Sequence, residues 1–430
     1  MITIRTNLLV RSGEDLRFSI DSPKAMQVHS QTGVYIKVRG WVLGKDGSAP
    51  NIVLDNPEKT IITPCISRPD VAMVHSSKNL NCGFEFYIEL GKGLKIGAIV
   101  NTAQLWFAEI SFDSFGVLKG SDNYLFLDND TNKSLSQYKG ELLIDSDNLA
   151  GWHRYFGNTE AQEGVLYGKS AFLIAPGKEY IFPDKYPIVR QGLSTFDQFL
   201  SIFNKNYIIN PLKELYAERN YTYSKVDTHW THFGAKVVAE TVCKKFGVNF
   251  TEPTSTYSFS EISGDLGGKL VPAQLERIPE IDMPHIEACR IFDNRIGNRG
   301  RIHVYHNPAA ATPKTCVIFD DSFSTTLAPQ LVETFQRLVH VFSGADIDWR
   351  IVKYEKPDFL VAEITTRFLI KAPYANFTIE SELARKYSAM TKVKRDSELT
   401  KLLAYTESSV EFYKQICLTA LHENSEQTSQ

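Results

Sequence analysis

The spacing of apolar residues changes once along this 430-residue chain, and that change limits the possible folds more than any other feature. Up to about Phe112, apolar and polar residues alternate, as they do in residues 34–39, 84–90 and 105–110. A period of two is typical of strands with one buried face. Turn-rich stretches such as residues 44–48 separate these runs, and no helical pattern lies between them. The pattern predicts a β-sandwich over residues 1–115.

After Gly120 the pattern becomes one of strands followed by helices. Residues 171–175 and 316–319 are apolar throughout, as expected for strands that are buried on both faces of a parallel sheet. Thr231 is a predicted N-cap for a helix that runs towards Gly247, and a second amphipathic helix is predicted at 329–341. These features predict a separate α/β domain over residues 116–375.

Residues 376–430 are polar and rich in helix-forming residues, with few apolar positions. This composition predicts a helical appendage that packs on the α/β domain or forms an oligomer contact. Its last seven residues, 424–430, predict a disordered end.

Charge and hydropathy exclude several classes of protein. The formal net charge is −3 and no block of basic residues occurs, which argues against a nucleic-acid partner. No apolar stretch is long enough for a signal peptide or a transmembrane segment, so we expect a cytoplasmic protein. The six cysteines occur singly and form no CxxC pair, which predicts free thiols rather than a zinc site.

Asp227 and His229 form the first cluster of candidate catalytic residues. In an extended segment, residues two apart point the same way, so the carboxylate can orient the imidazole through one ring nitrogen. The other nitrogen is then free to act as a base near neutral pH. A purely structural Asp–His hydrogen bond explains the same spacing.

Ser322 stands directly after the apolar run at 316–319 and before a predicted helix. This places a hydroxyl at the carboxyl end of a parallel strand, where the active sites of open α/β sheets lie. Backbone N–H groups of the turn can stabilise an oxyanion there. A simple helix cap accounts equally for a serine at this position.

Together the two clusters resemble the motifs of polysaccharide O-acetyltransferases of the alginate-modifying kind, members of the SGNH-hydrolase-like superfamily. In that family an Asp-x-His-Trp motif precedes a Gly-Asp-Ser-Phe motif that carries the nucleophile. Here residues 227–230 read Asp-Thr-His-Trp and residues 320–323 read Asp-Asp-Ser-Phe, with Asp320 in place of glycine. Weaker matches follow the family's order at residues 120–127, 174–178, 264–266 and 357–363. The resemblance covers roughly residues 120–372.

The resemblance implies an SGNH-like α/β domain in which Ser322 is the nucleophile, His229 the general base and Asp227 its orienter. An acetyl group would pass through a serine acyl-enzyme to a sugar hydroxyl of a bacterial surface polysaccharide or its precursor. Trp230 and Lys178 are candidate substrate-binding residues, although a core tryptophan and a solvated lysine are the plainer interpretations.

Cofactor and partners follow from the same resemblance. No bound cofactor is expected, and acetyl-CoA is a candidate acetyl donor if the protein is cytoplasmic, whereas relatives often work in the periplasm. The expected partners are a polysaccharide or glycan-intermediate acceptor and other glycan-assembly enzymes.

Three other functions stay open. A carbohydrate acetylesterase would use the same three residues with water as acceptor. A non-catalytic glycan-binding scaffold needs no nucleophile. A metal-dependent hydrolase would draw its ligands from a D-x-H-x-x-H pattern and from more distant histidines, namely Asp227, His229, His232, His303 and His306.

The N-terminal segment has a looser resemblance of its own. Residues 40–43, 68–71 and 82–84 are similar to small β-sandwich modules that stand beside bacterial glycan-modifying enzymes. Such a module would bind glycan or dock a partner enzyme, and a purely structural sandwich is the alternative.

Overall fold

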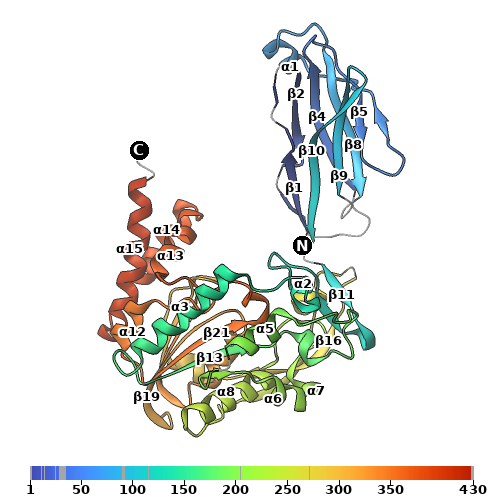
Figure 1. Cartoon of the computed structure of the whole chain (residues 1–430). Helices are drawn as coiled ribbons and strands as arrows, with labels where there is room; N and C mark the ends of the chain where they lie inside the picture. The colour runs from blue at the N-terminus through green and yellow to red at the C-terminus, as the bar shows by residue number, and fades with distance from the viewer. Residues whose placement is uncertain are drawn as a thin grey trace. The chain divides into compact units, whose positions relative to one another are not determined.

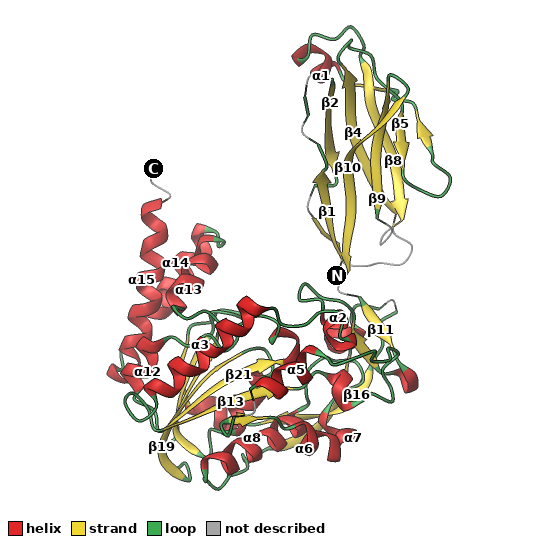
Figure 2. Ribbon diagram, viewed as in Figure 1, coloured by secondary structure: helices red, strands yellow, loops and turns green. Residues whose placement is uncertain are grey.

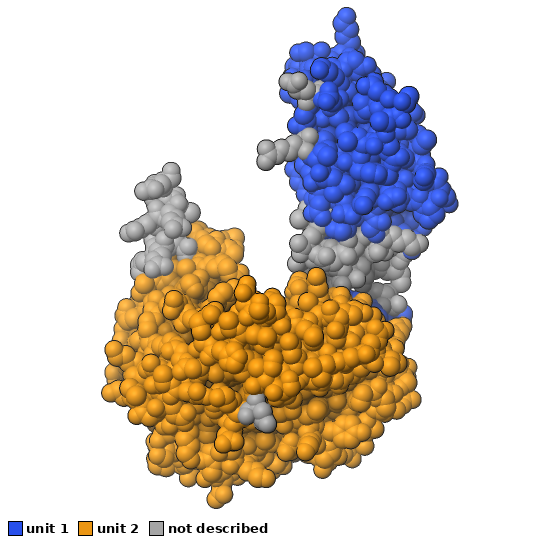
Figure 3. All heavy atoms as spheres, viewed as in Figure 1, with its two compact units in different colours: residues 1–116, 269–273 blue, residues 117–268, 274–430 orange. Residues whose placement is uncertain are grey.

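The computed structural model describes most of the chain, which divides into two compact units (Figure 3). The described residues are 2–10, 12–13, 15–24, 26–28, 35–89, 93–114, 116–203, 205–270 and 272–427. One unit comprises residues 1–116 and 269–273, and the other comprises residues 117–268 and 274–430. Val34 and Leu90, at the ends of two predicted strands, lie outside the described residues, as do residues 428–430.

The first unit contains two antiparallel sheets and one short helix, α1 (Pro69–Val74). The six-stranded sheet has the order β3 (Met26–Val28), β1 (Ile2–Leu8), β10 (Ala103–Ser114), β9 (Leu94–Val100), β5 (Ile52–Leu54) and β6 (Ile61–Ile62). The four-stranded sheet has the order β2 (Leu16–Ser22), β4 (Tyr35–Gly44), β8 (Asn81–Glu89) and β7 (Ile66–Ser67). The predicted strands at 105–110 and within 34–39 and 84–90 are therefore present.

A large hydrophobic core holds most of this unit together. It combines alternate residues of both sheets, such as Val38 and Phe84 from the four-stranded sheet with Ile96 and Ile110 from the six-stranded sheet. Each of these four side chains is almost completely buried. The alternation of apolar and polar residues seen in the sequence therefore marks the inward-facing and outward-facing positions of the strands.

The second unit is built on a seven-stranded mixed sheet (Figures 1 and 2). Its order is β14 (Ile208–Ile209), β13 (Lys169–Ala175), β21 (Phe359–Thr365), β19 (Thr312–Asp320), β20 (Phe335–Phe342), β18 (Ile302–His306) and β17 (Arg290–Asp293). The strands from β14 to β20 run parallel, β18 is antiparallel to β20, and β17 is antiparallel to β18. The predicted apolar strands at 171–175 and 316–319 lie within β13 and β19. Strand β19 is the central strand of the sheet, and β13 lies next to the edge strand β14.

Helices cover both faces of this sheet, which explains why its strands are apolar throughout. One face carries α3 (Ser146–Gln162), α5 (Thr195–Ile202) and α12 (Trp349–Glu355), whose apolar side chains join a cluster with Phe172 and Phe319. The other carries α8 (His232–Phe246) and α11 (Ser324–Gln330), which join a cluster with Leu173 and Ile318. Successive residues of a strand therefore enter opposite cores.

Smaller elements complete the second unit. Two strand pairs are present, β11 (Val117–Lys119) with β12 (Leu125–Leu127) and β15 (Thr256–Ile262) with β16 (Glu276–Asp282). The remaining short helices before β19 are α2 (Ser134–Lys139), α4 (Lys178–Ile181), α6 (Leu212–Ala217), α7 (Arg219–Thr222), α9 (Gly264–Gly267) and α10 (Pro284–Cys289).

Helix α8 begins and ends where its sequence predicts. The hydroxyl of Thr231 accepts a hydrogen bond of 3.1 Å from the N–H of Gly234, and Gly247 ends the helix with a left-handed φ of 73°. Both are standard solutions for the unpaired backbone groups at helix ends.

The prediction of a helix at residues 329–341 is wrong. Helix α11 ends at Gln330, and the buried strand β20 occupies residues 335–342. Phe335, Leu338, Val339 and Val341 are almost completely buried. An apolar run that is buried on two faces has no period that separates helix from strand, and here pairing with β19 decides the outcome.

The C-terminal segment forms α13 (Ile379–Ser388), α14 (Lys392–Leu403) and α15 (Glu411–Gln427). Tyr413, Ile416 and Cys417 of α15 belong to the core cluster on one face of the seven-stranded sheet. The disordered end is predicted from Asn424, whereas α15 continues to Gln427. Among the described residues, no helix combines the length and hydropathy needed to cross a membrane.

Candidate functional site

Ser322 lies in the turn between β19 and α11, at the carboxyl end of a parallel strand. Asp227 and His229 lie in the loop that leads into α8. The Nε2 atom of His229 is 2.8 Å from the Oγ atom of Ser322, and its Nδ1 atom is 2.8 Å from Oδ1 of Asp227. Two segments 93 residues apart thus meet through one continuous line of hydrogen bonds.

Backbone groups hold the Asp227 carboxylate in this orientation. Its Oδ1 atom also accepts the N–H of His229 at 2.9 Å, and its Oδ2 atom accepts the N–H of Asp265 at 3.0 Å. These bonds fix the rotamer of the carboxylate, which in turn fixes the plane of the imidazole. A donor at Nδ1 leaves Nε2 as the acceptor that faces Ser322.

The pKa values of the pair move apart. Burial raises the pKa of Asp227, but the hydrogen bond and attraction of His229 outweigh it and lower that pKa to about 2. Burial lowers the pKa of His229, but the hydrogen bond and charge of Asp227 outweigh it and raise that pKa above its ordinary value. The carboxylate therefore stays ionised and makes the imidazole a stronger base.

Buried carboxyl groups shape the turn that carries Ser322. Asp321 accepts the N–H of Phe323 at 3.0 Å and the N–H of Thr365 at 2.8 Å. Glu363 accepts the N–H of Asp321 at 3.1 Å. Within the described part of the chain, no hydrogen bond engages the N–H of Ser322 itself. That N–H is a candidate oxyanion donor, whereas the N–H of Phe323 is already used.

Asp320, which precedes Asp321 at the end of β19, points away from Ser322 and into the protein. It is fully buried, and its Oδ1 atom lies 3.0 Å from Nε2 of His340 on β20. Burial raises the pKa of Asp320 well above its usual range and lowers the pKa of His340 to about 3. Burial thus disfavours the charged form of each group, and the two share a hydrogen bond beneath the turn.

Trp230 does not line the pocket beside Ser322, which corrects its predicted role in substrate binding. Its indole is 2% exposed, and its N–H donates to the carbonyl oxygen of Phe323 at 2.9 Å and to Thr326 at 3.0 Å. The tryptophan thereby ties the segment that carries His229 to the turn that carries Ser322.

Lys178 is also a structural residue rather than a substrate contact. It is 1% exposed, and its ammonium group donates to the carbonyl oxygens of Ser224, Lys225 and Asp227 at 3.0, 3.2 and 2.6 Å. Burial lowers the pKa of Lys178 to about 8, although nearby carboxylates favour its charged form. Through these three hydrogen bonds the lysine anchors the loop that carries Asp227.

The structure separates the histidines of the metal-site hypothesis. Among the described residues, the acidic and histidine side chains whose ligand atoms lie within 4.8 Å of one another are Asp227, His229 and Asp265. Their atoms already make hydrogen bonds, because His229 contacts Ser322 and Asp265 accepts both the N–H and the hydroxyl of Thr228. His232, His303 and His306 do not join this group.

A pocket of about 560 Å³ opens beside Ser322 and His229. Three of its cations come from the region that follows β21 or from α13: Arg367, Lys371 and Lys386. Lys371 donates to the hydroxyl of Tyr374 at 2.8 Å, and the Nε atom of Arg367 is buried without a partner among the described residues. Arg367 also lies 3.9 Å from Asp130, and Lys386 donates to the carbonyl oxygen of Gly297 at 3.0 Å. These cations thus have partners within the protein and still place positive charge beside the serine.

Sequence reasoning missed two groups of residues here. Gly264-Asp265-Leu266 was a recognisable motif, but its contact with Asp227 depends on the fold of the β15–β16 insertion. The cations of the pocket carry no shared local signal, because they come from separate segments that only the fold brings together.

No family model and no curated protein matches the chain. Solved structures that it resembles include Bacillus cereus PatB1, with 12% identity, a TM-score of 0.43, and 60% of this chain and 99% of that chain covered. A DHHW family protein from Eubacterium siraeum has 16% identity, a TM-score of 0.40 and coverages of 59% and 95%. The chain is likewise similar to the O-acetyltransferase domain of Pseudomonas putida AlgJ, with 15% identity, a TM-score of 0.39 and coverages of 61% and 95%.

Proposed function

We propose that this chain is an O-acetyltransferase that carries an acetyl group on Ser322 and delivers it to a sugar hydroxyl of a polysaccharide. The observation that carries the proposal is the hydrogen-bonded line from Asp227 through His229 to Ser322, with 2.8 Å at both links. A nucleophile, a base within reach of its proton and an orienter of that base are what acyl transfer needs.

The first half-reaction forms the acyl-enzyme. His229 Nε2 takes the proton of Ser322 as Oγ bonds to the carbonyl carbon of the acetyl donor. The tetrahedral oxyanion accepts the N–H of Ser322, and Asp227 stabilises the imidazolium that has formed. The bond to the leaving group then breaks, and that group leaves with the proton from His229.

The second half-reaction transfers the acetyl group. A sugar hydroxyl gives its proton to His229 as its oxygen attacks the acyl carbon. Collapse of the second tetrahedral intermediate breaks the bond to Oγ, and Ser322 regains its proton. Water in place of the sugar would release acetate, which is the reaction of an esterase.

The cations of the pocket beside Ser322 favour a substrate that carries an anionic group. Arg367, Lys371 and Lys386 provide donors that suit the phosphates of acetyl-CoA, our proposed acetyl donor. In that arrangement the cations would bind the nucleotide end of the donor, while the thioester carbonyl lies at Ser322.

Intact-mass analysis after incubation with p-nitrophenyl acetate, and separately with acetyl-CoA, tests the proposal. We expect one acetyl adduct in the wild type and none in Ser322→Ala. Ser201→Ala, which removes an exposed hydroxyl on α5, should keep the adduct and serves as the matched control. An adduct that persists in Ser322→Ala would overturn the assignment of the nucleophile.

Product analysis separates the two reactions. With a neutral or acidic oligosaccharide present, a transferase yields acetylated sugar, whereas an esterase yields free acetate alone. A protein that forms no adduct with either donor would instead fit the glycan-binding scaffold.

For the first unit we propose a β-sandwich module that binds glycan. Its supporting feature is the outer face of β4 and β8, where Tyr35 and Tyr87 are largely exposed and Lys37 lies opposite Tyr87. Loss of polysaccharide binding in a full-length Tyr35→Ala, Tyr87→Ala variant is the expected result in an affinity electrophoresis assay. Unchanged migration would leave docking of a partner enzyme as the alternative role.

A further inference from the structure

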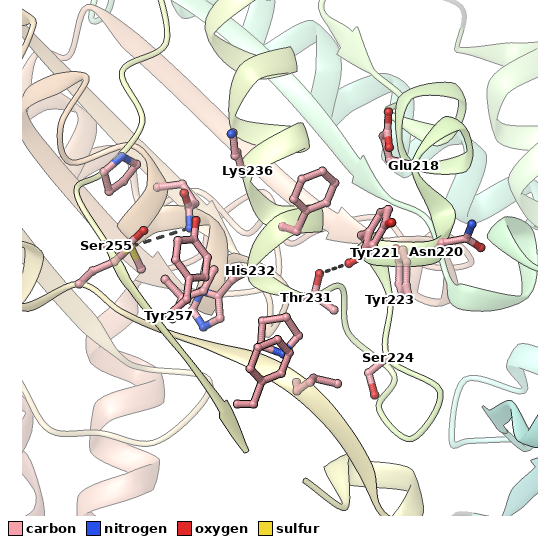
Figure 4. A pocket seen from close by; sticks show the side chains of 18 of the residues that line it. Glu218, Asn220, Tyr221, Tyr223, Ser224, Thr231, His232, Lys236, Ser255 and Tyr257 are labelled. Carbon is pink, nitrogen blue, oxygen red and sulfur yellow. Dashed lines mark hydrogen bonds between the residues drawn. The ribbon is translucent and has the colours of Figure 1, made fainter. Parts of the chain in front are cut away.

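A second pocket, of about 580 Å³, lies elsewhere on the second unit. It shares no lining residue with the pocket beside Ser322. Its walls come from the β15–β16 pair, from the start of α8 and from the residues around α7. Figure 4 shows Tyr257 and His232 on one side, Tyr221 and Tyr223 on the other, and Thr231 between them. The volume is within the usual range of ligand sites.

Exposed aromatic rings gather in this pocket. Tyr257 and Phe259 are two positions apart on β15 and therefore lie on the same face of the strand. Their side chains are 62% and 64% exposed. Tyr221 and Phe233 are 65% and 37% exposed, and their rings meet edge to face with centroids 5.8 Å apart. Contact with water is unfavourable for large aromatic rings, and covering them with a ligand is favourable, so a cluster of exposed rings indicates a binding surface.

The charges of the pocket argue for an uncharged ligand. Three acidic side chains (Glu218, Glu252, Glu276) stand against two basic ones (Lys236, Arg277). The basic ones are both engaged, because Lys236 pairs with Glu252 at 2.7 Å and the Arg277 guanidinium lies 5.1 Å from the ring centre of Phe259. In the pocket beside Ser322 basic side chains outnumber acidic ones, whereas here the acidic ones outnumber the basic ones, which disfavours a phosphate or carboxylate.

Hydrogen-bonding groups stand between the rings. The Nδ1 atom of His232 is buried and has no partner among the described residues. The ring of His232 as a whole is half-buried and lines the pocket, where it can take a hydrogen bond from a ligand hydroxyl. The side chains of Asn220 and Ser255 also line the pocket. Aromatic faces and hydroxyl partners together suit a pyranose ring, whose C–H face packs on an aromatic ring while its edge forms hydrogen bonds.

We propose that this pocket binds neutral sugar residues of a polysaccharide, at a site distinct from the one that holds Ser322. The sugar rings would stack on Tyr257, Phe259 and Tyr221 and donate a hydroxyl to His232. If the proposed function holds, the occupant is a stretch of the acceptor polymer away from the hydroxyl that is acetylated. Binding itself does not depend on Ser322.

Saturation-transfer NMR with full-length protein tests this site. The probes are three neutral tetrasaccharides: cellotetraose, maltotetraose and tetra-N-acetylchitotetraose. We expect transfer to the ring protons of at least one probe with wild-type protein and a loss of at least tenfold in affinity with Tyr257→Ala, Phe259→Ala. Both side chains are mostly exposed, so the double variant should keep the wild-type melting temperature.

Two control variants separate this site from the reaction site. Tyr216→Ala removes an exposed tyrosine that lines neither pocket and should bind as the wild type does. Ser322→Ala should also keep binding even though it forms no acetyl adduct. No transfer to any of the three probes, or equal binding in the double variant, would overturn the proposal. Binding of decanoate in place of the sugars would reveal an acyl-chain site instead.

Discussion

At the scale of single residues, the charge state of His229 decides whether Ser322 can act as a nucleophile. Only the neutral imidazole can take the proton of Ser322, and Asp227 raises the pKa of that imidazole above its ordinary value of 6.5. The fraction of neutral His229 grows as the pH rises through this pKa. The rate of acylation should therefore rise with pH along a limb whose midpoint lies above 6.5.

Replacing Asp227 by asparagine should move this limb to lower pH. The variant loses the charge that raises the pKa of His229, while the burial that lowers it remains. The maximal rate should fall by roughly 10²-fold or more, because the imidazole also loses its orienter. The measurement is the pH dependence of Ser322 modification by a sulfonyl fluoride, followed by intact mass.

Asp147→Asn, which removes an exposed carboxylate in the first turn of α3, is the matched control and should keep the wild-type profile. A midpoint that does not move in Asp227→Asn would mean that Asp227 does not set the basicity of His229.

At the scale of elements, the insertion that contains β15, α9 and β16 holds the loop that carries Asp227. The N–H groups of Leu266 and Gly267 both donate to the carbonyl oxygen of Val226 at 3.0 Å. Glu276 accepts the N–H of Lys225 at 2.6 Å. Together with the three carbonyl oxygens that accept hydrogen bonds from Lys178, these contacts hold the loop largely through its backbone.

Asp265→Ala should slow sulfonylation of Ser322 by about tenfold, the effect of roughly one or two lost hydrogen bonds. The carboxylate of Asp265 accepts the N–H and the hydroxyl of Thr228, next to His229, and alanine removes both contacts. Asp265→Asn keeps one acceptor oxygen and should recover part of the rate.

Melting temperatures separate a local effect from unfolding. Sulfonylation of Ser322 in Asp265→Ala at the wild-type rate would mean that the contacts between Asp265 and Thr228 have no role in positioning His229. A rate that falls only in proportion to the unfolded fraction would mean the same.

At the scale of the whole molecule, helix α15 is part of the second unit's core. Tyr413 is fully buried, and its hydroxyl donates to Glu355 at 2.7 Å. The same carboxylate binds Arg337 of β20 at 2.6 and 2.7 Å. Helix α15 is thus connected to β20. Strand β20 pairs with β19, and the turn that carries Ser322 follows β19.

Tyr413→Ala should lower the free energy of unfolding of the second unit by about 3–5 kcal/mol, the usual cost of deleting a buried aromatic ring. Tyr413→Phe keeps the ring and should cost about 1 kcal/mol for the lost hydrogen bond. Chemical denaturation of the full chain measures both. Leu403→Ala, at a position 55% exposed, should change stability by less than about 0.5 kcal/mol. Equal values for Tyr413→Ala and Leu403→Ala would contradict the core assignment.

The sequence by itself determined the local features of this protein. The period of two marked β4, β8 and β10, the apolar runs marked β13 and β19, and Thr231 marked the start of α8. It also singled out Asp227, His229 and Ser322. Each of these signals depends on residues a few positions apart, where side-chain direction and backbone capping act directly.

Only the tertiary structure decided what depends on distant partners. It made residues 335–342 a strand through pairing with β19, and it turned Lys178 and Trp230 inward as supports. It also brought His229 to 2.8 Å from Ser322 and set Asp265 behind Asp227. These outcomes follow from burial and hydrogen bonding between segments far apart in the chain, and no local pattern of residues specifies which segments will meet.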